Sequence, residues 1–319
     1  MHLYAYFTSF LGMYMTQSCI HSLIAALIAD RAISSWGITN PLTRQRFRIA
    51  IIFIALFSFP LYQLINPERG SLVFRLDTLF DSSRWLNLVI WGRLTLGLPF
   101  ILLLSATSLL FLIQEIIPVA RHAAGSRQLS PDWDRLDEQS EIMRGLRRLQ
   151  GEPPDFYITE SKEHILFTRT GKKPSIYFST GLIDDLTVEQ LEAAIAHEIA
   201  HIKRNKRPLL IAVFFLRIVL FFNPVVLLEF RRIVHEEEAI CDDMAVESTG
   251  NPHALAESLE KLYYKLDDEG SSLVRRGHIS HLRDRITRIE SRRLLGQSGQ
   301  SGKLAFIVII IVALNYFVV

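Results

Sequence analysis

The chain has 319 residues, a length typical of about two domains. Its 49% hydrophobic content excludes a disordered or fibrous protein, and a net charge of +2 argues against a direct nucleic-acid partner. Two cysteines are too few for a disulfide-rich secreted scaffold.

Three apolar runs in the first 120 residues predict transmembrane helices. Residues 2–29 contain no charged side chain, and residues 50–65 and 94–120 form the second and third runs. Arginines follow the first and third runs, so the positive-inside rule places the N-terminus outside and the chain after residue 120 in the cytoplasm. We therefore interpret residues 1–120 as three transmembrane helices.

The polar region 121–302 is predicted to form the catalytic domain. A charged amphipathic pattern over residues 126–151 indicates a surface helix, and residues 155–159, 165–170 and 175–179 have the composition of short strands. A short linker rich in Gly, Ser and Gln leads to residues 303–319, which we predict to be a C-terminal transmembrane helix.

The helix expected after Thr187 carries the chemistry. Thr187 and Gln190 have the spacing of a capping box at its start. The pattern HEXXH follows as His197-Glu198-Ile199-Ala200-His201. Residues four apart share a helix face, so both imidazoles can bind one zinc ion, and Glu198 can take a proton from the metal-bound water.

A catalytic zinc ion needs a third protein ligand, and a carboxylate-rich helix follows at residues 235–243. Glu238 is the best candidate, and Asp242 one turn later could bind the second nitrogen of a ligand histidine. Cys241 and His235 lie three residues from Glu238 and stay open as alternative ligands, although a packed thiol and a surface histidine are the expected roles.

Another apolar run, residues 208–228, separates HEXXH from Glu238 and is interrupted by Asn223-Pro224. A simple crossing of the bilayer would put Glu238 on the opposite side from both histidines. Since Pro224 cannot continue a helical hydrogen-bond ladder, we predict a bent, re-entrant or interfacial hairpin that contacts the membrane. The basic residues Arg204, Lys206 and Arg207 would then lie near lipid headgroups.

Residues 175–246 resemble the membrane metallopeptidases of the beta-lactam sensor-transducer type (the BlaR/MecR antirepressor family). They resemble the HtpX and CAAX-prenyl-protease type more distantly. The resemblance rests on IYFSTGL at 176–182, AAIAHEIAHIKR at 193–204, FNP at 222–224 and EAICD at 238–242. The sequence LRDRI at 282–286 also looks like that family's short "L-basic-x-R-I" element.

The resemblance implies a mainly α integral membrane protein with N-terminal transmembrane helices and a cytoplasmic α+β gluzincin domain. His197, His201 and Glu238 would bind one Zn²⁺, Glu198 would be the general base, and Asp242 would support a ligand histidine. The expected location is the bacterial inner (cytoplasmic) membrane, with several passes and the active site facing the cytoplasm. No penicillin-binding sensor domain follows the last apolar run, so we do not expect a direct beta-lactam receptor.

The predicted activity is hydrolysis of peptide bonds in a cytoplasmic or membrane-proximal protein, with a repressor-type substrate and regulatory proteolysis expected. An extended substrate would pair with the sheet edge near residues 175–180. An oxyanion donor is also needed, and the candidates are His253, His278, His281 and Arg285.

The alternatives are a general quality-control protease of membrane proteins and a non-catalytic zinc-dependent signalling protein. An intramembrane protease is disfavoured, because basic residues directly follow HEXXH. The lipid bilayer, a protein or peptide substrate and a sensor or repressor protein are the expected partners. Homo-oligomer formation and self-cleavage within residues 121–154 stay open.

Overall fold

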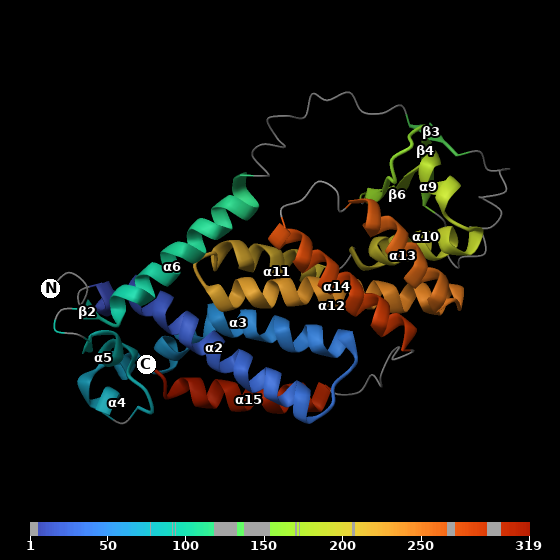
Figure 1. The fold of residues 1–319 in the computed structure, drawn as a ribbon. Coiled ribbons are helices and arrows are strands. Elements are labelled where there is room, and N and C mark those ends of the chain that lie inside the picture. Colours follow the sequence, from blue (N-terminus) through green and yellow to red (C-terminus); the bar gives the residue numbers. More distant parts are fainter. Residues whose placement is uncertain are drawn as a thin grey trace. The chain divides into compact units, whose positions relative to one another are not determined.

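The computed structural model describes residues 6–76, 78–90, 92, 94–117, 133–136, 154–169, 171, 173–205, 208–266, 272–291 and 301–319. The chain divides into two compact units (Figure 1). The first unit comprises Met1–Arg127, Leu209–Glu236 and Gln297–Val319, and the second comprises Gln128–Pro208 and Glu237–Gly296. Each unit therefore combines segments that are distant in the sequence.

The first unit contains three helices that are long and apolar enough to cross a membrane: α2 (Phe10–Ser35), α3 (Pro41–Ile65) and α6 (Gly97–Phe111), which a π-helical turn, η2 (Leu112–Ile116), extends. The Asn40 side chain accepts a hydrogen bond from the Thr43 N–H at the start of α3, as expected for an N-cap residue. The three predicted apolar runs thus coincide with three candidate membrane spans.

Short elements join α3 to α6: η1 (Pro67–Gly70), α4 (Leu72–Leu76), α5 (Ser82–Leu86) and the two-residue strands β1 (Val89–Ile90) and β2 (Leu94–Thr95), which pair antiparallel. The last helix, α15 (Ser301–Tyr316), packs against α2 and α3 (Figure 1). It is apolar but shorter than the three candidate spans.

The apolar run before the acidic helix forms a bent helical hairpin, and its contact with the membrane stays a prediction. Helix α11 (Pro208–Val219) ends before a turn, and α12 (Pro224–Thr249) begins at a proline, where the missing N–H costs nothing. The Asn223 side chain accepts from the N–H groups of Val225 and Val226 at 3.0 and 3.3 Å and so caps α12. Phe214 on α11 packs against Phe230 on α12, with ring centroids 6.3 Å apart.

The second unit contains a four-stranded sheet in the order β3-β4-β6-β5, formed by β3 (Asp134–Arg135), β4 (Asp155–Thr159), β5 (Leu166–Arg169) and β6 (Ser175–Ser179). β4 and β6 are parallel, and the outer strands are antiparallel to their neighbours. The predicted strands at 155–159 and 175–179 match β4 and β6. Most of the surface helix predicted over 126–151 lies outside the described residues, and its described part contains β3.

The sheet order corrects the predicted substrate edge. β6 is hydrogen-bonded to β4 on one side and to β5 on the other, so residues 175–179 have no free edge for a further strand. The edge on this side of the sheet is β5. Strand order depends on contacts between distant segments, which a local sequence pattern does not encode.

Helices α9 (Thr180–Asp185), α10 (Val188–Asn205), the second half of α12, α13 (Pro252–Leu266) and α14 (Ser272–Glu290) complete the second unit. Its core includes Ile176, Phe178, Leu182 and Ile195, which are fully buried. Gly181 has to be glycine, because a Cβ there would lie 2.6 Å from the Lys162 carbonyl oxygen. This close approach fixes the chain between β6 and α10.

Candidate metal centre

Helix α10 places the two HEXXH histidines on one face. The predicted capping box is present: the Thr187 N–H donates to Oε1 of Gln190 at 3.1 Å, and the Gln190 N–H donates to the Thr187 hydroxyl at 3.3 Å. His197 and His201, one helical turn apart, have ring centroids 4.7 Å apart. The local sequence is therefore sufficient to pair these two rings.

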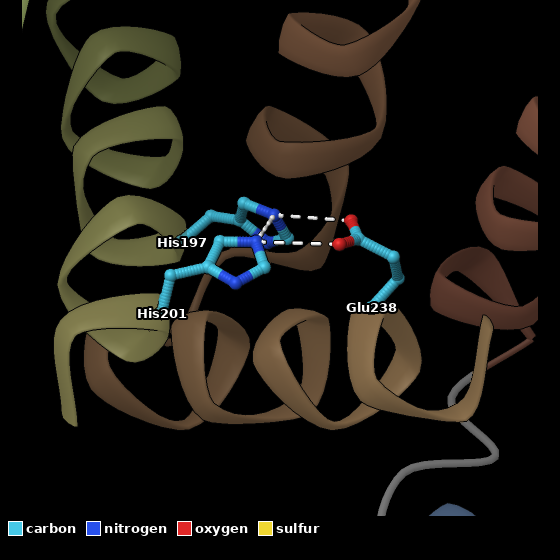
Figure 2. A group of neighbouring side chains, drawn as sticks. All are labelled: His197, His201 and Glu238. Carbon is cyan, nitrogen blue, oxygen red and sulfur yellow. Dashed lines mark hydrogen bonds and ion pairs between the residues drawn. The ribbon is translucent and has the colours of Figure 1, made fainter. Parts of the chain in front are cut away.

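Glu238 on α12 completes the group, although 36 residues separate it from His201. Figure 2 shows the three side chains converging from α10 and α12. The Nε2 atoms of the two histidines are 3.1 Å apart, and Glu238 oxygens lie 3.6 Å from Nε2 of His197 and 3.4 Å from Nε2 of His201. Among the described residues, this is the group of His, Cys, Asp and Glu side chains whose geometry suits a metal ion.

These distances fit a tetrahedral zinc ion. Ligand atoms at about 2.0–2.1 Å from zinc in tetrahedral geometry stand about 3.3–3.4 Å from one another. The Nε2–Nε2 distance of 3.1 Å and the distances of 3.6 and 3.4 Å from the two different Glu238 oxygens lie near that value. Two imidazoles and one carboxylate are also the donor set of a catalytic site that keeps its fourth position open.

Asp242 and Arg285 contact the metal group on the side away from the expected metal position. Asp242 is fully buried, and its Oδ1 lies 3.0 Å from Nδ1 of His197. Arg285 on α14 donates to both Asp242 oxygens, at 3.0 and 2.8 Å, and its Nη1 lies 3.1 Å from Oε2 of Glu238. The structure thus places Asp242 where the sequence predicted a partner for a ligand histidine.

The charges of this cluster control the protonation of its members. Burial alone would lower the pKa of His197, but the neighbouring carboxylates of Asp242 and Glu238 raise it to about 9. Burial and the neighbouring His197 lower the pKa of His201. Burial opposes ionisation of Glu238 and Asp242, yet His197 and Arg285 hold the pKa of both carboxyls below the usual range. The two carboxylates therefore favour the charged form of His197, and His197 in turn disfavours a charge on His201.

Two further arginines bind carboxylates of α12. Arg288 on α14 donates to Asp243 at 2.6 Å and to the Ala239 carbonyl at 2.7 Å. Arg204, in the last turn of α10, pairs with Glu237 and is 3% exposed. The expectation that Arg204 lies near lipid headgroups is therefore wrong, because this guanidinium has a carboxylate partner inside the second unit. Lys206 and Arg207 lie outside the described residues.

Glu198 contacts a residue that sequence reasoning missed. The hydroxyl of Thr168 on edge strand β5 donates to Oε2 of Glu198. β5 also packs against α10. The predicted general base is thus tied to the edge strand beside it. No sequence signal identifies Thr168, because a single threonine in a strand is ordinary.

A cavity of about 240 Å³ opens beside the metal group. The metal group and Glu198 form its polar side. The other walls are the imidazole of His164 and the apolar side chains of Leu166, Ala194, Leu255, Leu259 and Leu262. Nε2 of His164 lies 2.9 Å from a carboxylate oxygen of Asp185. His164 was not predicted from the sequence. The cavity has the size and character to take an apolar side chain next to the metal.

The other residues that the sequence suggested are the alternative metal ligands and the oxyanion donors. Cys241 Sγ lies 3.5 Å from Nδ1 of His201, and the metal group does not include it. His235 is exposed and also outside that group. Of the oxyanion candidates, His253 and His281 are exposed, Arg285 is bound to Asp242, and the side chain of His278 lies outside the described residues.

Comparisons with known proteins agree with this geometry. Residues 167–289 match the BlaR1 peptidase M56 family. The match begins in β5 and ends in α14, so it covers the edge strand, HEXXH, the apolar hairpin, Glu238 and Arg285. The resemblance to BlaR-type membrane metallopeptidases, inferred from the sequence, is confirmed for this segment.

The chain is also 40% identical over 78 residues to the plastoglobule-localized metallopeptidase 48, chloroplastic, of Arabidopsis thaliana. This alignment covers 24% of the present chain and 21% of the relative. The chain thus matches about a fifth of the relative's length. The similarity to that protein concerns a metallopeptidase, and together with the family match it supports a membrane-associated peptidase that uses a metal.

Proposed function

We propose that this protein is a membrane-bound zinc endopeptidase that cleaves a cytoplasmic or membrane-proximal protein. The observation that carries the proposal is the convergence of His197, His201 and Glu238 at the spacing of a tetrahedral zinc site, with Glu198 beside them. The match to a peptidase family supports the same conclusion.

Zinc, when bound, would polarise the scissile carbonyl and acidify the attacking water. The two histidines and Glu238 would hold the metal, and Asp242 would keep His197 in the tautomer that presents Nε2. Glu198 accepts the water proton and later delivers it to the leaving amine. The Thr168 hydroxyl holds the Glu198 carboxylate for this task.

The substrate would bind as an extended segment along β5. Within the described part of the chain, β5 is an edge strand, to which an extended segment can pair, and its Thr168 contacts Glu198. A substrate side chain next to the scissile bond would enter the cavity lined by Leu166, Leu255 and Leu259. This replaces the pairing expected near residues 175–180.

We further propose that the protein is a multi-pass protein of the bacterial inner membrane, with the active site facing the cytoplasm. The three candidate spans support membrane insertion, and the arginine distribution supports the orientation. Our preferred hypothesis is regulatory proteolysis of a repressor-type substrate. General quality control of membrane proteins would use the same site with another substrate, and a non-catalytic zinc protein would not need Glu198.

The decisive experiment compares wild type, Glu198→Gln and Glu189→Gln, an exposed position in the first turn of the same helix. Cell membranes containing each protein are analysed for new N-terminal peptides by mass spectrometry, and the zinc content of each purified protein is measured. We expect wild type and Glu189→Gln to cleave, and Glu198→Gln to keep zinc and lose cleavage. Cleavage by Glu198→Gln, or wild type without stoichiometric zinc, would refute the proposal.

A further inference from the structure

The two candidate zinc-binding histidines have chemically different partners behind them. Nδ1 of His197 faces the carboxylate of Asp242 at 3.0 Å, whereas Nδ1 of His201 faces the sulfur of Cys241 at 3.5 Å. Cys241 and Asp242 are adjacent on α12, and both are fully buried. A single stretch of helix therefore supports both rings.

The geometry determines which atom donates at His201. Nε2 of His201 lies 3.1 Å from Nε2 of His197 and 3.4 Å from Glu238, so Nε2 is the nitrogen that faces the metal position. A neutral imidazole that binds a metal through Nε2 carries its proton on Nδ1. That N–H points at Cys241, and at 3.5 Å the sulfur is within the range of a hydrogen-bond acceptor.

We propose that Cys241 is a positioning residue whose sulfur accepts the Nδ1–H hydrogen bond of His201 and fixes the ring with Nε2 toward the metal. The inference rests on the proposed zinc function. It assigns the thiol a place behind the ligand, not in the coordination sphere. Metal-binding histidines generally have such a partner, because it sets both the tautomer and the orientation of the ring.

The partners of the two histidines differ in charge. Asp242 brings a full negative charge to His197, and Arg285 partly compensates that charge. Cys241 provides an acceptor for His201 without adding a further carboxylate beside the buried Asp242 and Asp243. The thiol thus orients the ring at a lower cost in charge repulsion than another aspartate would have.

The test uses the full-length protein with Cys241→Ala, Cys241→Val and Cys241→Ser, and Cys19→Ala as the matched control. Cys19 is the other buried free cysteine and lies on α2 of the first unit. Alanine removes the acceptor and leaves space, valine removes it while filling the site, and serine restores an acceptor. Zinc affinity is measured by competition with a chelator, and the cobalt-substituted proteins are examined by visible absorption.

We expect alanine and valine to weaken zinc binding about tenfold and to shift the cobalt bands. Serine should recover most of the affinity, and Cys19→Ala should match wild type. Unchanged affinity and cobalt bands in the alanine or valine variant would overturn the proposal. An intense sulfur-to-cobalt charge-transfer band in wild type would also overturn it, by making Cys241 a ligand. Failure of wild type to bind zinc would instead refute the proposed function itself.

Discussion

Replacing Asp242 with asparagine tests how the buried charges support the zinc site. Asparagine keeps the size of the side chain but replaces one acceptor oxygen with a donor NH₂ group. In the wild type, both Asp242 oxygens accept hydrogen bonds from Arg285, and Oδ1 also faces Nδ1 of His197. In the variant, a donor therefore has to face another donor, either the guanidinium or the imidazole.

The size of the effect follows from these contacts. Loss of one hydrogen bond to a charged group costs about 1.5–3 kcal/mol. Removal of a residue that orients a metal-bound histidine weakens metal binding about 10–100-fold, which corresponds to about 1.4–2.7 kcal/mol. Arg285 keeps a carboxylate partner in Glu238 at 3.1 Å, so the guanidinium is not left as an isolated buried charge. We therefore expect zinc binding to weaken by an amount in the lower half of the 10–100-fold range. We also expect the variant to fold.

The assay is zinc affinity by chelator competition, together with thermal unfolding of the metal-free protein. Asp243→Asn is the matched control, because Asp243 is the neighbouring buried carboxylate and pairs with Arg288. Both variants should be less stable than wild type, but only Asp242→Asn should bind zinc more weakly. Equal zinc affinities in the two variants would refute the role of Asp242 behind His197.

Two further predictions follow from the same site. Thr168→Val should lower kcat about tenfold or more with little change in KM, because Glu198 loses a hydrogen bond to its charged carboxylate. Thr168→Ser should retain activity. Wild-type kinetics for Thr168→Val would contradict the role of Thr168. Zinc binding at pH 7 should release about one proton, because the pKa of His197 is raised to about 9 in the metal-free protein. Zinc affinity should accordingly fall as the pH drops below about 9, because a proton on His197 competes with the metal. Calorimetry in buffers of different ionisation enthalpy measures the protons released. No proton release would contradict the prediction.

Features that depend on near neighbours in the chain were predictable. The capping box at Thr187 and the pairing of His197 with His201 require only the spacing of residues on one helix. The bend at Asn223-Pro224 follows from the covalent restriction of proline, and the structure confirms it. Strands β4 and β6 were also recognisable from composition alone.

Features that depend on distant partners were not predictable. The sequence pattern of β6 suggested a strand but not that β4 and β5 would occupy both of its edges. The basic run after HEXXH suggested contact with lipid, whereas Arg204 is paired with Glu237. Thr168 has no motif of its own, and its importance arises only because β5 packs beside α10.

The sequence by itself determined the candidate spans, the HEXXH helix and the need for a carboxylate from a later segment. Which atoms meet was decided only by the tertiary structure. The rotation of α12 about its axis directs Glu238 toward Nε2 of both histidines, Asp242 toward His197 and Cys241 toward His201. Ion pairs between arginines on α10 and α14 and carboxylates on α12 hold that rotation, and local spacing along the chain does not specify it.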